Sequence, residues 1–90
     1  MKETSNHNKI REEIMKNNGK YGFLGEFVKV PNGKPLALVE CRYKQFHIYL
    51  DGTKAYPQTF DYASAFNEKG AARVKKDGEE FFINPKGERI

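Results

Sequence analysis

The chain has 90 residues, and its 16 Lys or Arg against 12 Asp or Glu give a formal net charge of +4. This length suits one domain, here residues 1–90, with a modest core, and the mixed charges are more typical of a solvated surface than of a strong nucleic-acid binder. The only cysteine, Cys41, excludes an internal disulfide and favours a reducing compartment. Because no apolar run approaches the roughly 18 residues of a membrane span, we expect a cytoplasmic protein.

The first twenty residues predict one amphipathic helix over residues 5–18. Ser5 or Asn6 is suited to the N-cap, and the segment KNNG, which ends at Gly19, is a typical helix stop. The apolar stripe of this helix consists of Ile10, Ile14 and Met15.

From Tyr21 onward, frequent Gly and Pro between aromatic and β-branched residues predict short strands and turns. The clearest hairpin has Asp77-Gly78 as its two turn residues. This turn pairs Val74 with Phe81 on an apolar face, and Ala72 pairs with Ile83 on the same face. The opposite face pairs Lys75 with Glu80 and Arg73 with Phe82.

The hairpin repeats within the chain. A shift of 35 residues without gaps aligns eight identical pairs: Tyr21 with Tyr56, Asn32 with Asn67, Lys34 with Lys69, Ala37 with Ala72, Val39 with Val74, Phe46 with Phe81, Ile48 with Ile83 and Gly52 with Gly87. Such a period indicates a repeat architecture. The first copy, residues 20–55, then turns at Arg42-Tyr43, and the second copy covers residues 56–90.

The last third of the chain resembles the WG-repeat family of bacterial proteins. The resemblance covers Phe60 to Ile90 and is looser over Tyr21 to Ala55. The residues that carry it are Phe60, Asp61, Ala63, Phe66, Gly70, Ala72, Val74, Gly78, Phe82, Ile83 and Gly87. The Trp-Gly pair of the family corresponds to Glu80-Phe81 here. The resemblance implies β-hairpin repeat modules that act in protein interaction, without catalytic residues.

The residues suggest no catalytic site, metal site or cofactor. His7 and His47 fall in different elements, and Cys41 has no His or Cys neighbour at a metal-ligand spacing. A Cys41–His47 nucleophile pair is disfavoured because the predicted hairpin places Cys41 opposite Lys44 and His47 opposite Leu38. We therefore expect a protein that is not an enzyme.

The first hairpin tip is the better candidate for a binding surface. Arg42-Tyr43 occupies a turn where Asp-Gly or Asn-Gly would fold with less strain, and Arg and Tyr are enriched at interaction hot spots. We predict a partner-binding surface of Arg42, Tyr43 and Lys44, with Tyr49 as a further member. The same cations and aromatic rings leave a second hypothesis open, weak binding of nucleic acid.

The outer face of the first hairpin is apolar, with Leu36, Leu38, His47 and Tyr49. Such a patch requires a cover. We expect the N-terminal helix to cover it, and the alternative is a partner chain. Two repeats are also few for a self-sufficient stack, so an open edge or end could pair with another copy or another protein.

Together these observations predict a mainly β protein with two tandem antiparallel hairpin repeats and an N-terminal helix as cap. The function we favour is a non-enzymatic protein-interaction module, and a small bacterial or phage adaptor or inhibitor would fit it. The partner would be another protein or a second copy, and the alternative is a weak, basic nucleic-acid-binding protein.

Overall fold

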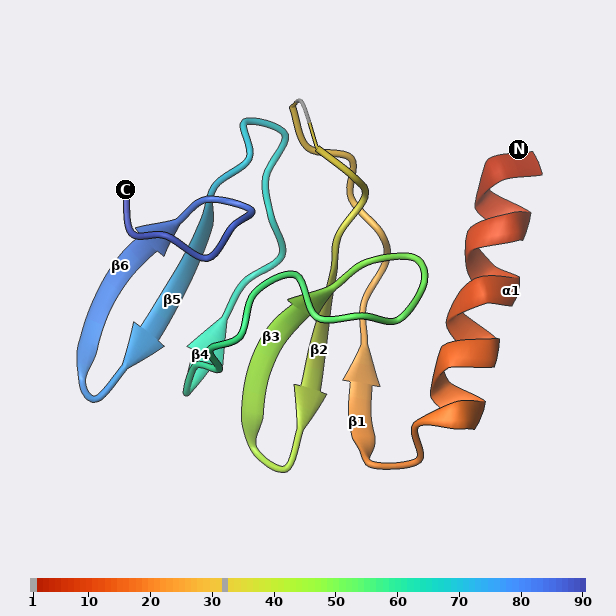
Figure 1. Cartoon of the computed structure of the whole chain (residues 1–90), viewed down its shortest axis with the longest axis horizontal. Helices are drawn as coiled ribbons and strands as arrows, with labels where there is room; N and C mark the ends of the chain where they lie inside the picture. Colours follow the sequence, from red (N-terminus) through yellow and green to blue (C-terminus); the bar gives the residue numbers. More distant parts are fainter. Residues whose placement is uncertain (1, 32) are drawn as a thin grey trace.

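The computed structural model describes residues 2–31 and 33–90 and contains one helix followed by two three-stranded antiparallel sheets (Figure 1). The helix α1 spans Lys2–Asn17. The first sheet contains β1 (Tyr21–Leu24), β2 (Ala37–Cys41) and β3 (Lys44–Ile48), and the second contains β4 (Tyr62–Ala63), β5 (Ala72–Lys76) and β6 (Glu79–Ile83). The predicted fold class, mainly β with a helix and two tandem halves, is confirmed.

Both hairpins have the predicted register. Val39 pairs with Phe46 in the first sheet, and Val74 pairs with Phe81 in the second. All four turn residues have positive φ angles: 54° for Arg42, 70° for Tyr43, 53° for Asp77 and 84° for Gly78. Such angles at both central positions are those of a type I′ turn, whose twist matches that of the flanking strands.

The repeat is real, but its spacing changes along the chain. From the second strand of each sheet onward the shift is 35 residues, whereas Leu24 pairs with Val39 as Ala63 pairs with Val74, a shift of 39 residues for the first strand. The loop between Val28 and Leu36 is four residues longer than the one between Asn67 and Ala71. We use the name unit 1 for residues 21–59, which precede the counterpart of Tyr21, and the name unit 2 for residues 60–90.

This spacing corrects part of the predicted repeat. The match of Tyr21 with Tyr56 is a coincidence, because the structural counterpart of Tyr21 is Phe60. Phe60 is therefore the first residue of unit 2 that has a structural counterpart in the strands of unit 1. The match of Lys34 with Lys69 falls in the loop whose length differs between the two units. Asn32, in the third of the early matches, lies outside the described residues.

Each unit contains the same stack of two aromatic rings and a cation. The rings of Tyr21 and Phe46 lie edge to face at 6.2 Å, and those of Phe60 and Phe81 do so at 6.1 Å. A cation lies over the second ring of each pair, Lys54 at 4.7 Å from Phe46 and Arg89 at 4.6 Å from Phe81. Edge-to-face rings and cation–π contacts each add to the burial of apolar area. The repeated unit is thus a side-chain stack as well as a hairpin.

The helix differs from its prediction at its start and in what it covers. It begins at Lys2, so Ser5 and Asn6 lie inside it and do not cap it. It lies beside β1 (Figure 1), where the Arg11 guanidinium donates to the Leu24 carbonyl at 3.0 Å. The helix therefore caps the end of the protein at which unit 1 lies. The described chain has no helix long and apolar enough to cross a bilayer.

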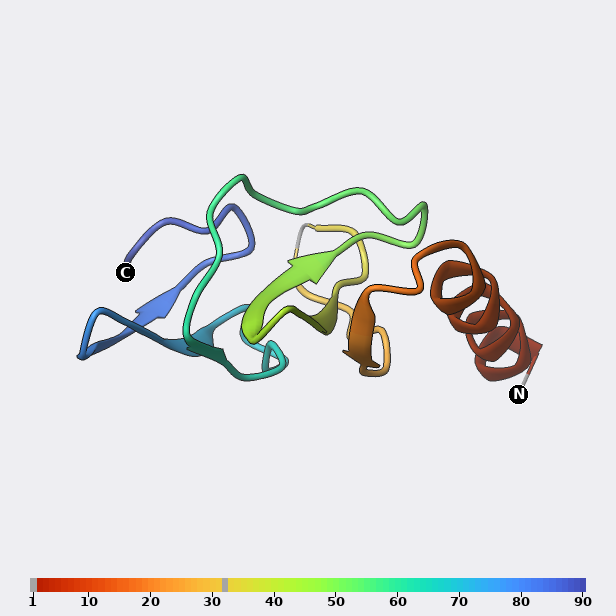
Figure 2. The ribbon, with the colours of Figure 1, turned by 90° about the horizontal axis from the view of Figure 1, so that it is seen from below.

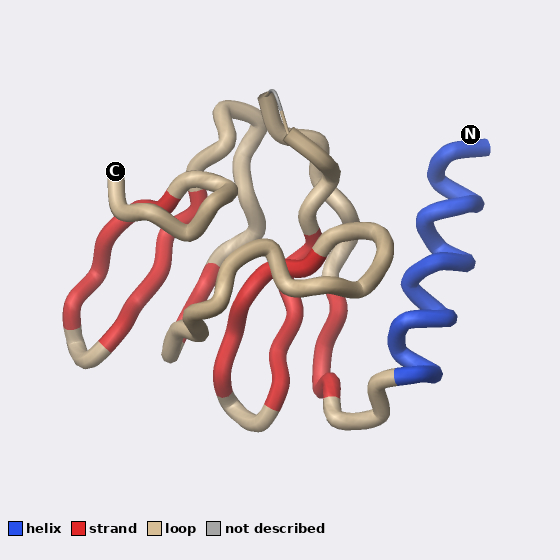
Figure 3. The backbone as a smooth tube through the Cα atoms, viewed as in Figure 1, coloured by secondary structure: helices blue, strands red, loops and turns tan. Residues whose placement is uncertain are grey.

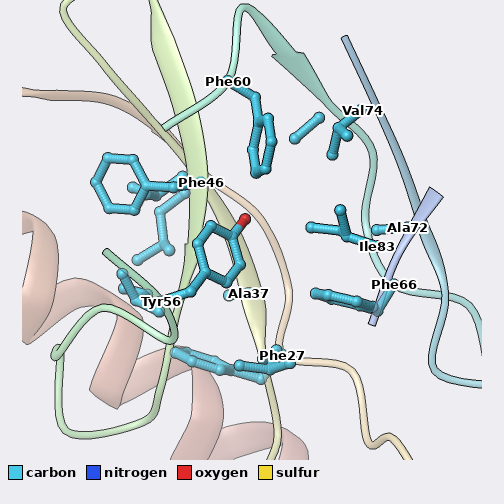
Figure 4. Close-up of a cluster of buried hydrophobic side chains, with 14 of the residues drawn as sticks. Phe27, Ala37, Phe46, Tyr56, Phe60, Phe66, Ala72, Val74 and Ile83 are labelled. Atoms are coloured by element: carbon cyan, nitrogen blue, oxygen red, sulfur yellow. The ribbon is translucent and has the colours of Figure 1, made fainter. Parts of the chain in front are cut away.

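The core lies between the strands and the two segments that follow the hairpins. Figure 2 shows the segment after β3 and the segment after β6 on the same side of the strands. The rings of Phe46, Tyr56, Phe60 and Phe66 lie in this core (Figure 4). One cluster of buried side chains spans both units, so each unit completes the core of the other.

Candidate protein-interaction site

The two hairpin tips point to the same side of the molecule (Figure 3). At the unit 1 tip the side chains of Arg42 and Tyr43 are exposed, and Tyr43 retains 89% of its accessible surface. Both residues hold left-handed backbone angles that glycine or asparagine adopts at lower cost. Two bulky side chains therefore occupy a strained turn and remain exposed to solvent.

Asp61 connects the two tips. Its Oδ1 lies 2.5 Å from the Lys44 ammonium, and its Oδ2 accepts the backbone N–H of Asp77 at 3.0 Å. The hydrogen bond with Lys44 lowers the pKa of the Asp61 carboxyl, and the same bond raises the pKa of Lys44. The Lys44 ammonium is thus held by an internal partner although its side chain is exposed, as are those of Arg42 and Tyr43.

The unit 1 turn lacks the support that Asp61 gives to Asp77. Gly22 occupies the position of Asp61 in unit 1, since Phe23 pairs with Glu40 as Tyr62 pairs with Lys75. Glycine has no side chain with which to accept the N–H of Arg42. The space around Gly22 is open, with no heavy atom within 4 Å of an added Cβ.

We expect Gly22→Asp to stabilise the protein by about 0.5 to 1.5 kcal/mol, the usual contribution of one hydrogen bond. The new carboxylate would accept the N–H of Arg42, as Asp61 does for Asp77. Urea denaturation measures the change. Gly22→Ala is the control, because it adds the Cβ without an acceptor, and equal stability of the two variants would contradict the prediction.

Tyr49 does not join the other predicted site residues. It follows β3 at the end opposite to the turn, about 20 Å along the strand from Tyr43 at the usual rise per residue. Its half-buried ring lies 5.6 Å from the Lys34 ammonium and lines a groove with Pro31, Leu36 and Pro85. The predicted surface therefore reduces to the tip itself.

His47, on the predicted outer face of the first hairpin, is covered by Tyr56, Ser64 and Phe66 and not by α1. His47 is fully buried; its Nδ1 accepts the Tyr56 hydroxyl at 2.6 Å, and its Nε2–H donates to the Ser64 carbonyl at 2.8 Å. The Phe66 ring lies 4.3 Å from the imidazole, centroid to centroid. Burial lowers the pKa of His47 to about 4 and raises the pKa of Tyr56.

The buried cluster of His47, Tyr56, Ser64 and Phe66 is a structural contact that the sequence analysis did not predict. This cluster joins unit 1 to unit 2. The position of His47 opposite Leu38, on an apolar face, is the sequence feature that could have indicated its burial. Cys41 is half-buried opposite Lys44, so it does not face His47. Among the described residues, no three His, Cys, Asp or Glu side chains come together as a metal site would require.

Comparison of this chain with known protein families, with curated proteins and with solved structures found no match. The function has to be argued from the surfaces of the chain, because a fold alone does not specify one. The unit 1 tip differs from its counterpart in unit 2 in both turn residues and in the support of the turn.

Proposed function

We propose that this chain is a non-enzymatic, cytoplasmic protein-interaction module whose contact surface centres on Arg42 and Tyr43. The observation that carries the proposal is the contrast between the two tips. Unit 2 turns at Asp77-Gly78 with support from Asp61, whereas unit 1 makes the same turn with two large exposed side chains and no such support.

The residue types at the tip suit a protein partner. Tyrosine offers a large, rigid contact area with a hydroxyl group, and arginine offers five hydrogen-bond donors, which is why both are enriched at interaction hot spots. The hairpin beneath them is rigid, because Val39 and Phe46 are buried in the core. A preformed tip loses little conformational entropy on binding.

The test replaces Arg42-Tyr43 with Asn-Gly. We expect the variant to be more stable than the wild type by about 1 kcal/mol or more, because Gly relieves the left-handed strain. Partner capture is measured with the immobilised protein and lysate of the native host, followed by quantitative mass spectrometry. Proteins bound by the wild type should be lost with the variant.

Two results would argue against this proposal. If the variant captures the same proteins in the same amounts, the tip is only a turn. If nuclease treatment of the lysate removes the captured material, nucleic acid is the partner. In that case Arg42→Ala should reduce the slope of log affinity against log salt concentration by about one unit, because one phosphate contact is lost.

The WG-repeat resemblance is part of the same proposal. Several of its pattern residues have structural roles in this chain that would serve a repeat module. Gly70, Gly78 and Gly87 have positive φ angles, and Ala63, Ala72, Val74 and Ile83 are buried. Asp61, at the aromatic-Asp opening of the pattern, connects two hairpin tips.

A further inference from the structure

The outer edge of β3 in unit 1 is occupied by unit 2. Gln45 and Phe60 exchange two backbone hydrogen bonds, of 2.8 and 2.9 Å, and the Gln45 Oε1 accepts the backbone N–H of Ala63 at 2.7 Å. The neighbouring His47 carbonyl accepts the N–H of Ala55 at 2.9 Å. Unit 2 therefore begins as an added strand on this edge.

The equivalent edge of unit 2 is open. The Phe82 carbonyl accepts the N–H of Ile90 at 2.9 Å, which repeats the bond between His47 and Ala55. Glu80 stands where Gln45 stands in unit 1, and within residues 2–31 and 33–90 no backbone group lies opposite its outward N–H and C=O. An unpaired strand edge of this kind is a template for β-strand addition.

The face of the same strand is uncovered as well. His47 in unit 1 is fully buried beneath Tyr56 and Phe66, whereas Phe82, at the same position in unit 2, is 48% exposed. Ile90 beside it is 66% exposed. The parts of the edge and of the face that Phe60 and Phe66 of unit 2 cover on unit 1 are thus open on unit 2.

The charges at this edge indicate what it accepts. In unit 1 the added strand carries Phe60 followed by Asp61, and Asp61 pairs with Lys44. In unit 2 the position of Lys44 is taken by Glu79, and that of Gln45 by Glu80. A strand with an acidic residue after the aromatic one would be repelled here, and a basic residue would be attracted.

The ion pairs that Glu79 and Glu80 make within the chain would not prevent them from pairing with a basic residue of an added strand. Glu79 pairs with Arg89 at 2.9 Å and Glu80 with Arg73 at 3.0 Å, and all four side chains are about half exposed. Exposed pairs contribute little to stability, so their rearrangement costs little.

A second copy of this chain is a poor occupant. Two β6 edges that are related by a two-fold axis and pair through the open N–H and C=O of Glu80 would bring Glu80 opposite Glu80, an unfavourable pairing of like charges. The segment of another copy that corresponds to Phe60–Ala63 is Tyr21–Leu24, which lies beside α1 and carries no basic residue. The edge therefore suits a chain of different sequence.

We propose that β6 accepts an extended segment of a partner protein as an antiparallel strand, with an aromatic residue opposite Glu80 followed by Lys or Arg. The apolar side chains of this segment would cover Phe82 and Ile90. This surface is separate from the unit 1 tip and shares with the proposed function only its class, protein binding.

The test uses two labelled peptides with the sequence of residues 59–66, one unchanged and one with Asp61→Lys. We expect the basic peptide to bind the whole protein about three to ten times more tightly than the acidic one, in line with the loss of a repulsion and the gain of an exposed pair. Fluorescence anisotropy measures the affinities. Amide shifts of Glu80 and Phe82 in NMR spectra locate the site.

Two controls make the result specific. N-methylation of the Phe60 nitrogen in the peptide removes the donor to the Glu80 carbonyl and should abolish binding. Glu79→Lys with Glu80→Gln gives unit 2 the charges of unit 1 and should reverse the preference in favour of the acidic peptide. The Asn-Gly tip variant should bind both peptides as the wild type does, which separates this site from the tip.

Several outcomes would overturn the proposal: no shift at Glu80 and Phe82 up to about 1 mM peptide, equal binding of the N-methylated peptide, or an unreversed preference in a folded double variant. Self-association of the free protein, abolished by Glu80→Pro, would also overturn it. That result would make the occupant a second copy.

Discussion

Replacing Gly87 with alanine should lower the free energy of unfolding by about 2 to 5 kcal/mol. Gly87 has a φ angle of 82°, and an added Cβ would lie 2.6 Å from Cγ of Tyr56 and 2.9 Å from Nε2 of Gln58. A left-handed angle costs an alanine about 1 to 2 kcal/mol, and overpacking a close contact costs about 1 to 3 kcal/mol more. Urea denaturation at neutral pH measures the loss.

Gly52→Ala is a matched control for this prediction, because Gly52 is the counterpart of Gly87 in unit 1. Its φ angle is 88°, but the nearest atom to an added Cβ, Cγ1 of Ile14, is 3.9 Å away. We expect Gly52→Ala to lower the free energy of unfolding only through its left-handed backbone angle, by about 1 to 2 kcal/mol. Equal losses for the two variants would show that Tyr56 does not pack tightly on Gly87.

The second large effect is a loss of stability in mild acid caused by His47. Its pKa is lowered from 6.5 to about 4 by burial. Between these two values the unfolded chain binds more protons than the folded one, so the stability is complete above about pH 6.5 and falls as the pH approaches 4. The shift corresponds to about 3 kcal/mol over this window, which chemical denaturation at a series of pH values can measure.

His47→Gln is the control for this effect. Its amide can donate to the Ser64 carbonyl and accept the Tyr56 hydroxyl, as the neutral imidazole does, but it does not titrate. Carboxyl groups whose pKa is lowered in the folded state, such as Asp61, also reduce the stability in acid. Their effect is the same in the wild type and in the variant. We therefore expect the variant to lose less stability than the wild type between pH 6.5 and 4. A parallel decline of the two would mean that His47 is not the cause.

The two hairpins could be predicted from the amino-acid sequence. Each turn lies within ten residues of the strands that it joins, and the alternation of side chains allows one register that buries Val39 with Phe46 and Val74 with Phe81. A shift by one residue would turn these apolar pairs to the solvent. The exposed tip at Arg42-Tyr43 follows from the same local rule.

The way in which the two units join could not be predicted from the sequence and is seen in the tertiary structure. The four additional residues between Val28 and Leu36 lie in a loop, where length changes cost little, so a shift without gaps could not place the counterpart of Tyr21. The burial of His47 under Tyr56 and Phe66 and the two bonds of Asp61 connect residues at least nine positions apart. Neither alternation nor turn chemistry specifies such contacts, because they depend on how unit 2 packs against unit 1. The sequence predicted an open edge or end, but its location at Glu80 of β6 emerged only in the structure, where the bonds of Glu80 could be compared with those of Gln45.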